Sequence, residues 1–179
     1  MMRPEPQQLQ QQARWLAFLL LASGLHIFES AMPSLGPWFK LGLANIVTLI
    51  VLATMGVRYA LALALARIII GALLLGTLLT PTFIVSLVAT LSAASVMVVV
   101  WRYVPNVSLL GVSLCAAVVH MAAQFWVVGA WIIQQEVLYQ LLPPFLLLAC
   151  VTGWLNGSLA RYMVAQLQVR DGEYIASKK

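Results

Sequence analysis

The sequence predicts an all-α integral membrane protein with six transmembrane helices and both termini in the cytoplasm. Of its 179 residues, 63% are hydrophobic and only 8% are charged, whereas about a quarter of the residues are charged in soluble globular domains. The hydrophobic residues form six runs separated by short polar or Pro/Gly-containing segments. The positive residues between these runs fall almost entirely on one side of the resulting topology.

The composition also predicts how the chain is divided. A soluble core could not bury so much apolar surface at this length, whereas lipid accepts it without a partner. We expect a polar cytoplasmic tail at 1–13, a six-helix membrane domain at 14–165 and a second polar cytoplasmic tail at 166–179. The first run resembles a secretory signal but lacks a small-residue cleavage site, so we interpret it as an anchor. The expected location is the cell inner (plasma) membrane, crossed several times.

Charge and cysteine content exclude other classes of protein. The net charge of +5 does not indicate a nucleic-acid partner, because the positive residues are scattered and form no basic stripe with interleaved aromatics. Cys115 and Cys150 lie in apolar runs without the spacing of a metal site, and we expect them to be small buried hydrophobic residues. The sequence therefore predicts no metal, no disulfide and no cofactor.

The first predicted helix is short for a membrane span. Residues 15–28 would extend ~21 Å at 1.5 Å per residue, against a hydrocarbon thickness of ~30 Å. Either the bilayer thins locally or the helix continues beyond Glu29. Both alternatives place Glu29 close to the headgroups or below them.

Glycine, proline and interfacial polar residues separate the remaining predicted helices. Gly56, Arg58 and Tyr59 are expected to form a tight interfacial turn, and Thr80-Pro81-Thr82 a short connection that makes an antiparallel hairpin. Pro143-Pro144 falls in the first turns of the last helix, where missing amide donors are tolerated. The further spans are expected at 41–55, 60–79, 83–100, 109–133 and 138–163.

The distribution of positive charge predicts the orientation. With six spans, the cytoplasmic side carries nearly all of the basic residues, because positive loops stay inside. The opposite side carries Lys40 together with Glu29 and Glu136. The residues on the predicted cytoplasmic side are Arg3, Arg14, Arg58, Arg102, Arg161, Arg170, Lys178 and Lys179.

Arg67 is the most unusual residue of the predicted membrane domain. It lies ~13 Å along the third helix from Arg58, near the middle of the membrane. A guanidinium there is costly unless it is paired or hydrated, and snorkelling to the interface is the structural alternative. Arginine suits planar anions such as carboxylate or phosphate. We interpret Arg67 as a paired or substrate-binding residue.

Four further polar residues lie within the hydrophobic runs. His120 and Gln124 are one helical turn apart and share a face, which is compatible with a lined cavity. Asn45 and Asn156 are further candidates for hydrogen bonds to a substrate. Each of the four can alternatively hydrogen-bond to a neighbouring helix and hold the bundle together.

The segment from Glu29 to Asn45 has the strongest concentration of polar, aromatic and turn residues. Glu29 and Lys40 can form an ordinary interfacial ion pair, which would contribute little. Alternatively, the segment is a gate over an outward-facing cavity, where Lys40 adds positive charge and Glu29 contacts the gate or a cationic substrate. The expected gate residues are Pro33, Gly36, Pro37, Trp38 and Phe39.

Catalytic motifs are missing from the sequence. The only aspartate is Asp171 in the C-terminal tail, so a paired-aspartate Mg²⁺ site for diphosphate chemistry cannot form. No nucleotide-binding GxxxxGK[ST] loop, HExxH motif or nucleophilic-serine elbow occurs. We therefore predict no catalytic residues and no enzymatic activity of this chain alone.

The same segment carries a family resemblance. Glu29-Ser30, a proline-rich loop and Lys40-Leu41-Gly42-Leu43-Ala44-Asn45-Ile46 resemble the hallmark of the Gx transporter family, also labelled heptaprenyl diphosphate synthase component I. That family is similar to the substrate-binding S components of energy-coupling factor (ECF) transporters. The resemblance implies an S-component-like bundle with a pocket under the first external loop.

The resemblance also implies partners. Ala13 and Ala17 match the small-residue pattern through which S components dock on a transmembrane coupling subunit, itself driven by two ATPases. The expected function is therefore uptake of a small anionic or amphiphilic metabolite, with the lipid bilayer as surroundings. The alternative is a non-catalytic accessory subunit of polyprenyl diphosphate synthesis, since the aspartate-rich motifs of such synthases are absent. The expected substrate-binding residues are Glu29, Lys40, Asn45, Arg67, His120, Gln124 and Asn156.

Overall fold

The computed structural model describes residues 6–31 and 42–177. Within these ranges the chain is helical and contains no strand, which confirms the predicted all-α class. The elements are α1 (Pro6–Ala31), α2 (Leu43–Met55), α3 (Val57–Leu74), α4 (Pro81–Tyr103), α5 (Leu109–Val127), the π-helical η1 (Val128–Ile133), the 3₁₀ helix η2 (Glu136–Leu141) and α6 (Leu142–Ser177).

Among the described residues, four helical segments are long and apolar enough to cross a membrane, which indicates a multi-pass membrane protein. They are Val57–Leu74, Pro81–Tyr103, Leu109–Ile133 and Glu136–Val169. The apolar α2 has only 13 residues, and α1 begins with glutamine-rich turns. The count of six spans and the cytoplasmic placement of the termini stay predictions.

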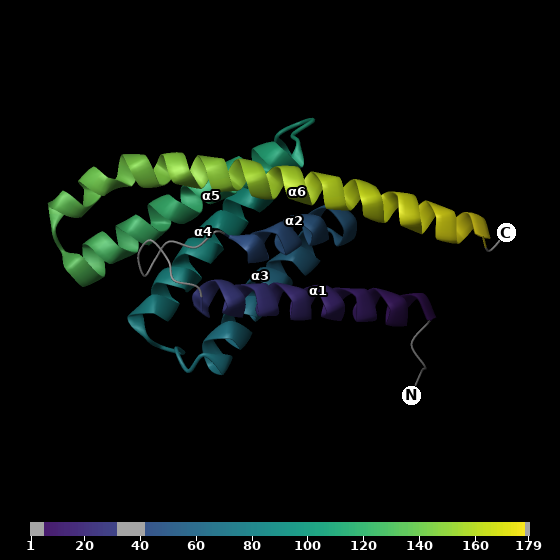
Figure 1. Ribbon diagram of the computed structural model, residues 1–179, viewed down its shortest axis with the longest axis horizontal. Coiled ribbons are helices and arrows are strands. Elements are labelled where there is room, and N and C mark those ends of the chain that lie inside the picture. The colour runs from purple at the N-terminus through teal and green to yellow at the C-terminus, as the bar shows by residue number, and fades with distance from the viewer. Residues whose placement is uncertain (1–5, 32–41, 178–179) are drawn as a thin grey trace.

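The helices form one elongated bundle. The start of α1 and the end of α6 lie at the same end of the molecule, and η1 and η2 lie at the opposite end (Figure 1). Helix α5 packs against α4 and α6, whereas α1 packs against α2 and α3. Helix α2 also contacts α6, so it joins the two groups of helices.

Helices α1 and α6 extend into the predicted polar tails. Residues 6–13 form the first turns of α1, and α6 continues through 166–177. Glutamine and alanine favour helix, and a proline is tolerated at the first helical position. The predicted tail boundaries therefore mark a change in polarity and do not mark the ends of the helices.

The break between α2 and α3 consists of Gly56 alone. Its φ of 95° and ψ of 177° are accessible to glycine and strained for other residues. Arg58 and Tyr59, expected to share the turn, already belong to α3.

The predicted Thr80-Pro81-Thr82 connection is wrong in its extent. The link between α3 and α4 covers residues 75–80, and Pro81 and Thr82 begin α4. Thr80 caps that helix, because its hydroxyl accepts a hydrogen bond from the Phe83 amide at 3.4 Å. A threonine cap followed by proline at the first position initiates a helix. The Pro143-Pro144 pair lies in the first turn of α6, as predicted.

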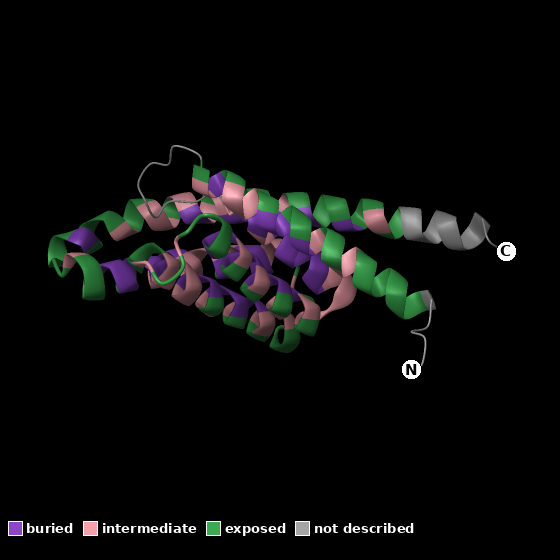
Figure 2. Cartoon of the chain, turned by 90° about the horizontal axis from the view of Figure 1, so that it is seen from below, coloured by how far each residue is buried: buried purple, intermediate pink, exposed green. Residues whose placement is uncertain are grey.

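Two apolar clusters form the interior. The tail-end cluster includes Val47, Leu49 and Ile50 of α2 together with residues of every other α-helix. The loop-end cluster is Val85, Met121, Phe125, Val127, Val128, Leu138 and Ala149, from α4, α5, α6, η1 and η2. In Figure 2, the buried residues follow the helix faces that meet one another.

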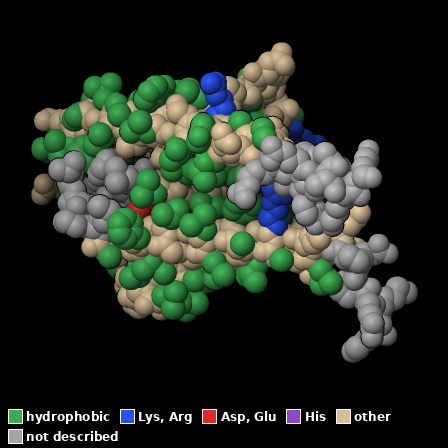
Figure 3. Space-filling model, turned by 45° about the vertical axis from the view of Figure 1, so that its right-hand side comes forward, with side chains coloured by type: hydrophobic (Ala, Val, Ile, Leu, Met, Phe, Trp, Pro, Cys, Tyr) green, Lys and Arg blue, Asp and Glu red, His purple; other side chains and the backbone are tan. Residues whose placement is uncertain are grey.

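The outer surface is largely apolar. Leu20, Leu74 and Leu147 are each at least 66% exposed, and hydrophobic side chains cover much of the face shown in Figure 3. Such a surface is compatible with lipid. Cys115 is exposed on it and Cys150 is partly buried. The expectation that both cysteines are buried is therefore wrong, because an apolar run in a membrane helix has a lipid-facing side as well as a buried one.

Candidate functional site

A polar cavity of about 70 Å³ lies between the two apolar clusters. One water molecule needs roughly 10–15 Å³ of such space, so the cavity has room for several water molecules. Ala93 of the tail-end cluster and Met121 of the loop-end cluster both reach its wall. All six α-helices contribute side chains to it: His26, Glu29, Asn45, Arg67, Ser86, Thr90, Ala93, Ala117, His120, Met121, Gln124, Ala149, Thr152 and Asn156.

The structure brings six of the seven predicted substrate-binding residues to this cavity, and their role stays a prediction. They are Glu29, Asn45, Arg67, His120, Gln124 and Asn156. The seventh, Lys40, lies outside the described residues, as do the predicted gate residues Pro33, Gly36, Pro37, Trp38 and Phe39. Ala13 and Ala17 are exposed on α1 and do not line the cavity.

Arg67 is buried at the cavity wall and does not snorkel to an interface. Its side chain is only 6% exposed. Its Nε has no hydrogen-bond partner among the residues that the structure describes. The carboxylate of Glu29 on α1 interacts with it electrostatically. Because a buried polar atom without a partner is costly, the guanidinium is a candidate to bind a ligand or water.

Glu29 joins α1 to the start of α2. Its Oε1 accepts a hydrogen bond from the Leu43 amide at 2.7 Å. The amides at the start of a helix lack partners inside the helix and carry partial positive charge, so a carboxylate there is stabilising. Gly42, at the N-cap of α2, offers no side chain for this purpose. Glu29 therefore stabilises the start of α2 through a hydrogen bond and interacts electrostatically with Arg67.

Gly42 is constrained by its conformation and by its neighbour. Its φ of 76° is left-handed, and an added Cβ would lie 3.1 Å from Nδ2 of Asn156. That Nδ2 donates a hydrogen bond to the Gly42 carbonyl at 3.3 Å. The backbone N–H of Asn45 donates a hydrogen bond to the same carbonyl at 2.8 Å. This carbonyl thus connects the start of α2 to α6 at the cavity.

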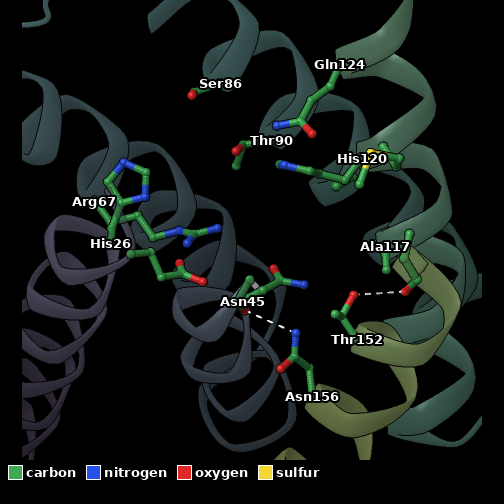
Figure 4. Close-up of a pocket in the computed structure, with 15 residues that line it drawn as sticks. His26, Asn45, Arg67, Ser86, Thr90, Ala117, His120, Gln124, Thr152 and Asn156 are labelled. Carbon is green, nitrogen blue, oxygen red and sulfur yellow. Dashed lines mark hydrogen bonds between the residues drawn. The ribbon is translucent and has the colours of Figure 1, made fainter. Parts of the chain in front are cut away.

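Figure 4 shows two sides of the cavity facing each other. Arg67 and His26 lie on one side, and His120 and Gln124 lie across from them. Gln124 is only 3% exposed. Among the described residues, no three His, Cys, Asp or Glu side chains could hold a metal ion together. The arrangement places a guanidinium, a carboxylate, two imidazoles and three side-chain amides around one cavity, which can bind a small polar or charged group.

The predicted substrate-binding set leaves out four of the polar cavity residues: His26, Ser86, Thr90 and Thr152. His26 lies one turn before Glu29, and from the sequence it is compatible either with the rim of a cavity or with the membrane interface. Serine and threonine give little signal, because in a helix they can bond to their own backbone. Thr152 does so, donating to the Ala149 carbonyl at 3.1 Å.

Close packing of α5 on α6 places the side of the cavity that carries His120 and Gln124. An added Cβ at Gly157 would lie 2.7 Å from Cα of Leu110, and one at Gly153 would lie 2.8 Å from Cβ of Ala117. The Ser113 hydroxyl donates to the Gly153 carbonyl at 2.8 Å. Small residues spaced four apart let membrane helices approach closely. The sequence analysis did not select this pair.

The family model of heptaprenyl diphosphate synthase component I matches residues 18–163. The chain belongs to this family. The matched range contains every residue that lines the cavity. The match confirms the family label that was inferred from the segment between Glu29 and Ile46. Comparison with curated proteins and with solved structures gives no match.

Proposed function

We propose that this chain is the substrate-binding, S-component-like subunit of a transporter that takes up a small anionic or amphiphilic metabolite. It would work in the plasma membrane with a transmembrane coupling subunit and ATPases, and would not itself be catalytic. The observation that carries the proposal is the buried Arg67, whose Nε lacks a described partner at the wall of a polar cavity.

The cost of burying Arg67 is the basis of this argument. Charged side chains inside a membrane are expensive, and they face cavities or partners that mark substrate pathways. The planar guanidinium can donate two parallel hydrogen bonds to a carboxylate or phosphate. Gln124 and Asn45 lie around the same cavity and offer further donors. A small anion would therefore receive both charge and hydrogen bonds.

Transport would require the cavity to be exposed first to the outside and then to the cytoplasm. The segment that precedes α2 would close over the bound molecule from outside, and the partner ATPases would drive reorientation of the bundle. The bond between Glu29 and the Leu43 amide supports this scheme, because it connects the cavity directly to the start of α2. A bound anion would compete with Glu29 for Arg67.

Native mass spectrometry of the gently solubilised protein tests the binding role. We expect the wild type to retain a small molecule and Arg67→Ala to lose it. Arg58→Ala is the matched control, because Arg58 is an exposed arginine on the same helix and its loss should leave the ligand in place. Equal ligand occupancy in all three proteins would remove Arg67 from the site.

The family description favours a second candidate. The chain could be a non-catalytic accessory subunit that presents an isoprenoid lipid to a soluble synthase. Affinity purification from membranes separates the two candidates. A coupling subunit with ATPases in the complex supports transport, whereas a prenyltransferase supports the accessory role.

A further inference from the structure

A second hollow lies on the outside of the bundle. A groove of about 450 Å³ runs between α2 and α6, with Leu43, Ile46, Trp154, Leu155, Leu159 and Tyr162 among its walls. The four α6 residues of this set are between 47% and 63% exposed. The groove therefore opens on the apolar surface that faces lipid.

The groove and the polar cavity share part of their walls. Thr152 and Asn156 line both hollows. The amide of Asn156 lies at this boundary, where its Nδ2 donates to the Gly42 carbonyl. At 3.3 Å this hydrogen bond is slightly longer than the usual range. One side-chain contact thus contributes to the separation of a polar hollow from an apolar one.

We propose that the cavity and the groove together bind one single-chain amphiphile, with its anionic head at Arg67 and its hydrocarbon tail between α2 and α6. This inference rests on the proposed function and narrows its substrate class. The polarity of the two hollows matches the two ends of such a molecule. An amphiphile in the bilayer would enter sideways, and its tail would stay in apolar surroundings throughout.

The dimensions favour one chain and a small head. A cavity of about 70 Å³ accommodates a carboxylate or phosphate group but not the glycerol and second chain of a phospholipid. The groove is bounded by two helices, and its walls are mostly aliphatic and aromatic. A fully polar metabolite would fill the cavity alone and leave the groove to membrane lipid.

Binding of straight-chain anions to the full chain in nanodiscs tests the proposal. The probes are butanoate, octanoate and dodecanoate, together with the alkyl phosphates of the same chain lengths. Empty nanodiscs give the partitioning into lipid, which is subtracted. We expect affinity for the wild type to rise with chain length in at least one series, and Arg67→Ala to weaken every member of that series.

A groove variant and a matched control identify where the tail lies. Leu155→Trp adds bulk inside the groove, whereas Leu147→Trp makes the same change at an exposed α6 position outside it. We expect Leu155→Trp to weaken dodecanoate or dodecyl phosphate by roughly tenfold, the worth of about two buried methylene groups. The shortest anion should bind both variants like the wild type.

The outcomes separate this inference from the proposed function. Arg67-dependent binding without a chain-length gain, or identical chain-length dependence in both tryptophan variants, would overturn the tail site and leave the transport proposal standing. Loss of Arg67 dependence in both series would overturn the head site. The retained native ligand, tested separately with Arg67→Ala, decides the binding role in the proposed function.

Discussion

The two walls of the cavity are built in different ways. The charged wall, formed by His26, Glu29 and Arg67, comes from α1 and α3. The amide wall, formed by Thr90, His120, Gln124 and Asn156, comes from α4, α5 and α6. Side-chain bonds attach the charged wall to its neighbours, as in the contact of Glu29 with the Leu43 amide.

The amide wall has side-chain hydrogen bonds as well, but close packing of α6 on α5 is its main support. Gly153 and Gly157 bring α6 against α5 so closely that an added Cβ would meet other atoms at less than 3 Å. Interiors packed in this way resist small movements, whereas a single hydrogen bond can be exchanged for one to a ligand. The charged wall is therefore the adjustable side of the site, and the amide wall is its fixed side.

Gly157→Ala should have the largest effect on the amide wall. The new methyl group would approach Cα of Leu110 at 2.7 Å, and such overpacking costs roughly 1–3 kcal/mol. We expect a lower thermal midpoint in detergent, measured by scanning fluorimetry. Gly24→Ala on α1 is the control, because nothing lies within 4 Å of its Cβ position. Equal midpoints for the two variants would contradict close packing of α5 on α6.

Arg67→Lys tests whether the charged wall requires a planar donor. The ammonium keeps the charge but cannot bind an anion through two parallel hydrogen bonds. We expect ligand affinity to fall about tenfold, or roughly 1.4 kcal/mol, as measured by titration in nanodiscs. Unchanged affinity would show that charge alone is sufficient.

Glu29→Gln tests the contacts that the Glu29 carboxylate makes with the Leu43 amide and with Arg67. The amide oxygen can still accept from Leu43, but the charge that interacts with Arg67 and with the helix dipole is lost. Loss of the helix-dipole interaction alone should lower stability by roughly 0.3–1 kcal/mol, and loss of the interaction with buried Arg67 adds to this. We expect anion affinity to rise severalfold, because the competing carboxylate is gone. Weaker binding would instead favour Glu29 as the contact for a cationic group.

Gly71→Ala should have the smallest effect of the four. An added Cβ would lie 2.5 Å from Cδ2 of His26, so the imidazole must shift at the cavity wall. Because this ring is the end of a side chain and not backbone, we expect only a severalfold loss of ligand affinity and a small change in midpoint. Gly24→Ala again serves as control. A loss as large as that of Gly157→Ala would show that the charged wall is equally rigid.

Individual polar residues were predictable because the membrane makes them expensive. Arg67 and Gln124 interrupt apolar runs, and the cost of immersing such groups in lipid can be seen without coordinates. The prediction failed for Thr90 and Thr152, whose hydroxyls can bond to the local backbone. The close-packed Gly153 was missed because a glycine shows its packing only when the facing helix is known.

The order of hydrophobic and polar residues along the chain specifies apolar helices in a membrane and marks the charged and amide residues among them. Hydrophobicity and charge act on each segment separately, so these properties are local. Packing between the helices brings residues from six helices to one cavity, joins Glu29 to the start of α2, and forms a groove beside α6 that shares Asn156 with that cavity. These features depend on contacts between distant segments, which no single segment specifies.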